Sequence, residues 1–81
     1  MKARVLVRLN DTVVDKAGQV VCQRLAEAGF AEVRQAKVGK LIELEIDSGD
    51  AENTKARIDQ MCKRLLMNVS YEEYDLILIN E

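Results

Sequence analysis

Four consecutive apolar residues, 76–79, end the last extended segment of this 81-residue chain. Alternate side chains of a strand point to opposite faces, so Leu76 and Leu78 share one face. Ile77 and Ile79 share the other. A strand that is apolar on both faces has to be buried on both. The helices of so short a chain can cover only one face, so we expect Leu76, Ile77, Leu78 and Ile79 to form a self-association surface.

Two further segments alternate apolar and polar residues as half-buried strands do. They cover residues 3–9 and residues 40–47. A weaker and more polar strand is predicted for residues 31–38. Because Gly39 lies between residues 31–38 and residues 40–47, the sequence predicts a hairpin of these two strands that turns near Gly39.

Two segments repeat apolar residues every three or four positions, as helices do. The first spans residues 15–28, with Asp15 as the N-cap and Gly29 as the glycine that follows the last turn. Gly18 near its start either allows another backbone to approach closely or is simply tolerated there. The second helix follows Asp50, which can act as its N-cap. Its apolar stripe consists of Ile58, Met61, Cys62, Leu65 and Leu66.

The resulting order, β-α-β-β-α-β, predicts an α+β two-layer sandwich with ferredoxin-like connectivity, in which an antiparallel sheet carries two helices on one face. Residues 1–81 are expected to form a single domain. No apolar run approaches the roughly 18 residues that a membrane span needs, and the first residues do not resemble a signal peptide. We therefore expect a cytoplasmic protein with no membrane partner. A domain this small is marginal alone, which favours a homo-oligomer or docking onto larger proteins.

Few residues of the sequence could carry catalysis or bind a metal. It has no histidine, and its two cysteines lie forty positions apart, so neither a metal cluster nor a Ser-His type triad is expected. We interpret Cys22 and Cys62 as small buried apolar residues. Glu43 and Glu45 share one strand face, where solvated surface is a better interpretation than an acid–base pair. The sequence therefore predicts no catalytic residue, no metal site and no cofactor.

Charge is divided unevenly along the chain. Residues 1–40 carry eight basic and four acidic groups, whereas residues 41–81 carry four basic and ten acidic groups. The two signs could help one chain fold or pair with its copy. Alternatively, a basic patch around Arg34, Lys37 and Lys40 could meet an acidic partner or a phosphate. The net charge of −2, the absence of tryptophan and the single phenylalanine predict no nucleic-acid partner.

Three stretches, spread over nearly the whole chain, share residues with a known family. They are residues 5–15 followed by Gly18, then Phe30, Val33 and the run 37–40, and finally the run 61–68 followed by residues 72–74. In their order and spacing they resemble the PurS family of small subunits of phosphoribosylformylglycinamidine synthase. The chain departs from the family pattern at Lys16, where a proline is usual, and at residues 69–71.

The resemblance implies a non-catalytic accessory subunit of an enzyme of de novo purine biosynthesis, a ligase that uses ATP and glutamine. Its expected partners are a synthetase (PurL-type) subunit and a glutaminase (PurQ-type) subunit, which it would bridge for ammonia transfer. A homodimer or homotetramer is also implied. ATP, Mg and glutamine would serve the assembled enzyme, and this chain itself would bind none of them.

Lys37, Gly39 and Lys40 are the residues that we predict to face the larger subunits. Gly39 would permit a turn conformation that strains other residues, and the two lysines would form a polar rim. The alternative function is a stand-alone regulatory domain that binds a small metabolite as a dimer. A small hydrolase of the acylphosphatase kind is a third possibility, which predicts turnover by the isolated chain.

Overall fold

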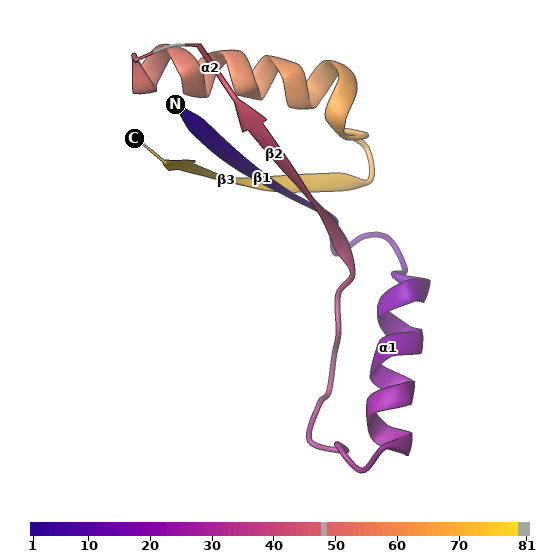
Figure 1. Cartoon of the computed structure of the whole chain (residues 1–81). Coiled ribbons are helices and arrows are strands. Elements are labelled where there is room, and N and C mark those ends of the chain that lie inside the picture. The colour runs from indigo at the N-terminus through magenta and orange to yellow at the C-terminus, as the bar shows by residue number, and fades with distance from the viewer. Residues whose placement is uncertain (48, 80–81) are drawn as a thin grey trace.

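A computed structural model describes residues 1–47 and 49–79 of the chain (Figure 1). In this part, the strands β1 (Lys2–Leu9), β2 (Gly39–Glu45) and β3 (Glu72–Ile79) form one antiparallel sheet in the order β2-β1-β3. The helices are α1 (Lys16–Glu27) and α2 (Ala51–Met61), and α2 continues into a π-helical turn, η1 (Cys62–Leu66). The predicted α+β class with an antiparallel sheet is confirmed.

The hydrophobic core lies between α2 and one face of the sheet. Every second residue of β1 points into it, and Ile58 and Cys62 reach it from the helical side. The apolar role predicted for Cys62 is confirmed. The fully buried apolar residues of the described chain are Ala3, Val5, Val7, Ile58 and Cys62.

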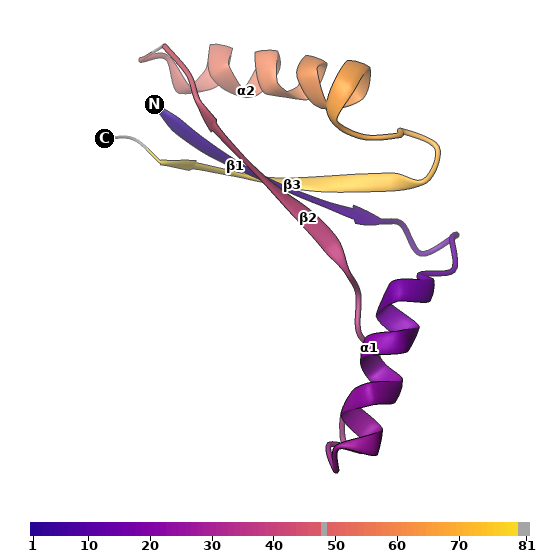
Figure 2. The same cartoon turned by 45° about the vertical axis from the view of Figure 1, so that its right-hand side comes forward.

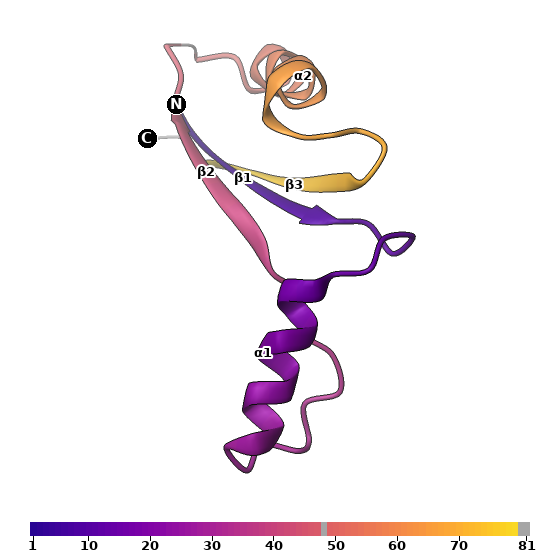
Figure 3. The ribbon, with the colours of Figure 1, turned by 90° about the vertical axis from the view of Figure 1, so that its right-hand side faces the viewer.

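The first helix, α1, does not cover the sheet, contrary to the prediction that both helices lie on one face. In Figures 1, 2 and 3, α1 extends away from the end of the sheet, while α2 lies across it. Gly18 is the buried residue of α1, and apolar side chains such as Val20 and Val21 stay exposed. The first turn of α1 is fixed to the segment that precedes β2 and not to the sheet.

Residues 31–38, which connect α1 to β2, do not form the strand that was predicted for them. They pair with no strand of the described chain. They run back alongside α1 toward the sheet (Figure 1). There is no hairpin at Gly39, because β2 begins at this residue and pairs with β1.

The chain is longer and thinner than a compact domain of its size. Its radius of gyration is 15.8 Å, whereas about 12 Å is typical for 81 residues. Its accessible surface is 6109 Å², about 1,200 Å² more than the scaling for a compact monomer of this mass gives. A standard interface covers about 800 Å² per partner. The surplus therefore has the size of a protein interface.

None of the described helices has the length and apolar content that a membrane span requires.

Candidate functional site

The carboxylate of Asp15 connects α1 to the segment that precedes β2. Its Oδ1 accepts a hydrogen bond from the backbone N–H of Gly18 at 2.8 Å, which confirms the predicted N-cap. Its Oδ2 accepts from the N–H of Val38, also at 2.8 Å. Both hydrogen bonds lower the pKa of Asp15 because they favour the charged form, and the bond from Val38 has the larger effect. One side chain thus starts the helix and holds the returning segment.

Gly18 permits the close approach of these two segments. A Cβ atom at this position would lie 2.1 Å from the carbonyl oxygen of Ala36. Of the two interpretations that the sequence left open, the structure therefore favours close backbone approach. Further along, the Cys22 thiol donates to the carbonyl of Val33 at 3.4 Å. We call α1 together with residues 28–38 the arm.

The arm turns back at Gly29, as predicted. Gly29 has a φ of 100°, in the region where side chains are disfavoured. The N–H of Phe30 then donates to the carbonyl of Leu25 at 2.8 Å, which closes a Schellman turn. The direction of the returning segment is therefore determined by the end of α1.

The three residues predicted to face larger subunits lie at the junction of the arm and β2. Lys37 donates to Asp11 at 2.6 Å, and this hydrogen bond, with the charge of the lysine, lowers the pKa of Asp11. Gly39 does not have the turn conformation that was predicted for it, since its φ is not positive. Its Cβ would instead lie 2.3 Å from the carbonyl oxygen of Val7, so it serves close strand pairing. Lys40 is exposed and pairs in register with Val7.

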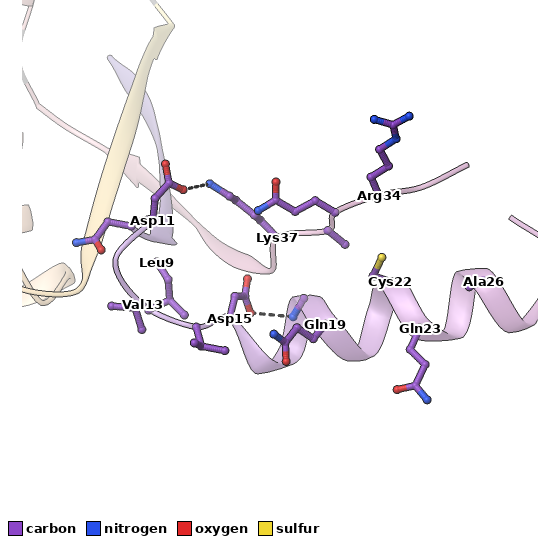
Figure 4. A pocket seen from close by; sticks show the side chains of 15 residues that line it. Leu9, Asp11, Val13, Asp15, Gln19, Cys22, Gln23, Ala26, Arg34 and Lys37 are labelled. Atoms are coloured by element: carbon purple, nitrogen blue, oxygen red, sulfur yellow. Dashed lines mark hydrogen bonds and ion pairs between the residues drawn. The ribbon is translucent and has the colours of Figure 1, made fainter. Parts of the chain in front are cut away.

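A pocket of about 530 Å³ lies at the base of the arm (Figure 4). Its apolar walls include Leu9 and Val13, and Gln19 adds polar groups. Figure 4 shows Lys37 directed toward Asp11, whereas Arg34 extends away from α1. The carboxylates of Asp11 and Asp15 in this pocket accept hydrogen bonds, from Lys37 and from the backbone of Gly18 and Val38 respectively. The described residues contain no group of three Cys, Asp or Glu side chains placed to hold a metal ion.

The four residues predicted to mediate self-association are divided between the two faces of the sheet. Leu76 lies opposite Val5, and Leu78 lies opposite Ala3, so both face α2. Ile77 lies opposite Arg4 on the other face and is 46% exposed. We call this second face, which no helix of the described chain covers, the open face. Its apolar members are Leu6, Leu41, Ile77 and Ile79.

Ion pairs border the open face at one end. Arg8 contacts both Glu73, at 3.1 Å, and Asp75 on the neighbouring strand. Sequence reasoning did not single out this network, although the register of two alternating strands would bring such residues together. The open face therefore combines an exposed apolar area with an ion-pair network at one end.

A hydrogen bond joins α2 to β3 on the opposite side of the sheet. The hydroxyl of Tyr74 donates to Asp59 at 2.7 Å, and Lys63 contacts the same carboxylate at 2.9 Å. The bond to Asp59, with burial, raises the pKa of Tyr74 to about 12, because it stabilises the protonated hydroxyl. The same bond, with the one from Lys63, lowers the pKa of Asp59.

We expect this contact to be visible in an alkaline titration. Because the pKa of Tyr74 is raised by folding, its hydrogen bond contributes fully to stability at a pH below 10, the ordinary tyrosine pKa. This contribution is lost as the pH rises through about 12. Ultraviolet absorbance of tyrosinate should show one group with a midpoint near 12. Tyr74→Phe should remove that group, and Asp59→Asn should move its midpoint toward 10. An unchanged midpoint in Asp59→Asn would contradict the assignment.

Comparison with known proteins gives one family over almost the whole chain. The model of the PurS family, described as phosphoribosylformylglycinamidine (FGAM) synthase, matches residues 2–80. The chain is 37% identical over 71 residues to the phosphoribosylformylglycinamidine synthase subunit PurS of Synechocystis sp., which is 88% of this chain and 71% of that protein.

Solved structures agree with this match. The chain resembles Bacillus subtilis PurS with a TM-score of 0.81 and 30% identity, covering 94% of each chain. It also resembles a chain in the structure of PurLQS from Thermotoga maritima, with a TM-score of 0.85 and 27% identity, covering 96% of this chain and 95% of that one. Both likenesses extend over more than nine tenths of this chain.

Proposed function

The chain belongs to the PurS family of FGAM synthase subunits, and from this premise we propose that it is the accessory subunit of a cytoplasmic PurLQS-type complex. In this proposal it has no active site of its own. It brings a glutaminase subunit and a synthetase subunit together so that ammonia passes between them. ATP, Mg and glutamine are used by the larger subunits. The likeness to a chain of PurLQS is the observation that carries the proposal.

The surfaces of the chain support an assembly role. Its surplus accessible surface is about the size of an interface, and both the arm and the open face leave apolar side chains exposed. We propose that a second copy covers the open face at Ile77 and Ile79, while Leu76 and Leu78 remain in the core of their own chain. The self-association surface predicted from the sequence is thereby reduced to one face of β3, with the arm as a second element.

We propose that the junction at Lys37, Gly39 and Lys40 faces a larger subunit. Lys40→Glu should weaken assembly, because Lys40 is exposed and charge at an interface rim governs encounter and register. The isolated chain should keep its circular dichroism spectrum and its oligomeric state. Lys55→Glu is a matched control, since Lys55 is an exposed residue of α2 that lies outside the junction and the arm. Equal co-elution of Lys40→Glu and the wild type with the larger subunits would contradict the role of Lys40.

Glutamine-dependent turnover tests the accessory role directly. The synthetase and glutaminase subunits are assayed for amidine formation with and without this chain, once with glutamine and once with an ammonium salt. Turnover with glutamine should require the chain, and turnover with free ammonia should not. If the chain neither changes turnover nor co-elutes with the pair, the proposal is wrong.

A metabolite-binding regulatory domain is the second candidate. The pocket at the base of the arm favours it, because about 530 Å³ is large enough for a small ligand. In that case a metabolite should raise the melting temperature of the isolated chain. A screen that finds no such ligand, together with glutamine-dependent coupling, would eliminate this candidate.

A further inference from the structure

Leu65 has an unusual position for a residue of a helical apolar stripe. The repeat that places Ile58 and Cys62 in the core predicts that Leu65 is also buried. In the structure Leu65 is 85% exposed, the highest value among the large apolar residues of the described chain. A leucine this exposed gains nothing from folding unless another surface covers it.

The π-helical turn η1 explains the exposure of Leu65. In η1 the N–H of Met67 donates to the carbonyl of Cys62 at 3.0 Å, five residues back instead of four. This wider turn breaks the helical repeat, so that Cys62 stays buried while Leu65 points to solvent. Turns of this kind occur frequently at functional sites.

The surroundings of Leu65 are basic, although this half of the chain is acidic. All four basic residues of positions 41–81 lie on α2 or η1. Leu65 borders a shallow hollow of about 360 Å³ that no carboxylate lines. Arg64 makes no ion pair within the described residues, and Arg57 donates only to Gln60, at 3.4 Å. The hollow is lined by Arg57, Gln60, Met61, Arg64 and Leu65.

We infer that Leu65, with Arg57 and Arg64, forms a docking patch for a surface on one of the larger subunits, apolar at its centre and ringed by carboxylates. The inference rests on the proposed function, which supplies the partner. Charge favours such a partner over a second copy of this chain. A two-fold contact centred on the patch would bring Arg57 and Arg64 against the same basic residues of the copy, and like charges at an interface are unfavourable.

The affinity of the chain for the purified synthetase–glutaminase pair tests the inference. Leu65→Ser should weaken binding at least about tenfold, as the loss of a central apolar contact does. Charge reversal in Arg57→Glu with Arg64→Glu should slow association, and the effect should shrink at high salt. Lys55→Glu is the matched control, because Lys55 lies on α2 outside the hollow. It should bind like the wild type.

Each outcome decides one question. If the wild-type chain fails to bind the pair, the proposed function is wrong and the inference fails with it. If the wild type binds and the Leu65 and arginine variants bind equally well, the inference alone is wrong. If Leu65→Ser dissociates the homo-oligomer, the patch is a contact between copies, which also overturns the inference. Because all four substituted positions are exposed, the fold should be the same in every variant.

Discussion

Ile58→Ala should lower the free energy of unfolding by about 2–5 kcal/mol. Ile58 is 0% exposed and extends from α2 into the core, which it shares with the strand residues Val5 and Val7. Alanine at this position would leave a cavity that the surrounding residues could fill only in part. The whole stability of a domain is about 5–15 kcal/mol, so this loss would remove a large share of the stability of the isolated chain. The midpoint of urea unfolding, followed by circular dichroism, measures the change.

Leu65→Ala is the matched control for this prediction. It removes a similar amount of apolar side chain from the same helical segment, but from a residue that is 85% exposed. Its effect on the free energy of unfolding should stay within about 0.5 kcal/mol. Because self-association stabilises the folded chain by mass action, both variants are compared with the wild type at one protein concentration. Equal losses in the two variants would mean that Ile58 does not lie in the core.

The elements that the sequence predicted well are those that local pattern decides. The alternation in residues 3–9 determines which side of β1 is buried, and Val5 and Val7 lie in the core as that pattern requires. Asp15 and Asp50 cap the two helices as predicted, because an N-cap acts only on the next three residues. The glycine after α1 has the expected left-handed φ for the same local reason.

The position of α1 could not be predicted, because a long-range contact decides it. Asp15 bonds to Val38, which lies 23 positions further along the chain. A strand pattern in residues 31–38 gives no sign that their backbone approaches a helix instead of another strand. Gly39 was misjudged for a related reason. Its missing side chain serves close contact with Val7 and not a turn, and a sequence does not distinguish these two uses of glycine.

The exposed apolar surfaces of the chain were predicted only in part. The four consecutive apolar residues 76–79 correctly indicated an uncovered sheet face, because alternate side chains of a strand point to opposite faces of the sheet. Leu65 was misplaced, because a helical repeat assumes 3.6 residues per turn and η1, which contains Leu65, is wider than that. Misplaced apolar residues of this kind are informative, because they show which surfaces the chain does not bury by itself.

Gly18→Ala is the second change from which we expect a large effect. In an ordinary helix this substitution stabilises by up to about 1 kcal/mol. Here the new Cβ would lie 2.1 Å from the carbonyl oxygen of Ala36, and backbone must move to relieve the clash. We therefore expect a net loss of about 1–3 kcal/mol, as for overpacked sites. The returning segment should separate from α1, and the amide of Val38 should lose its bond to Asp15.

The expected consequence is selective, because the core between the sheet and α2 does not include the arm. Hydrogen exchange at Val38 should become faster, while exchange at Val5 stays slow. Sedimentation should show weaker self-association, since the arm is one of the surfaces that we propose a second copy covers. Gly49→Ala is the matched control, because no atom of the described residues, its chain neighbours aside, lies within 4 Å of a Cβ at Gly49. If Gly18→Ala behaves like Gly49→Ala in stability and exchange, the close approach at Ala36 does not hold the arm in place.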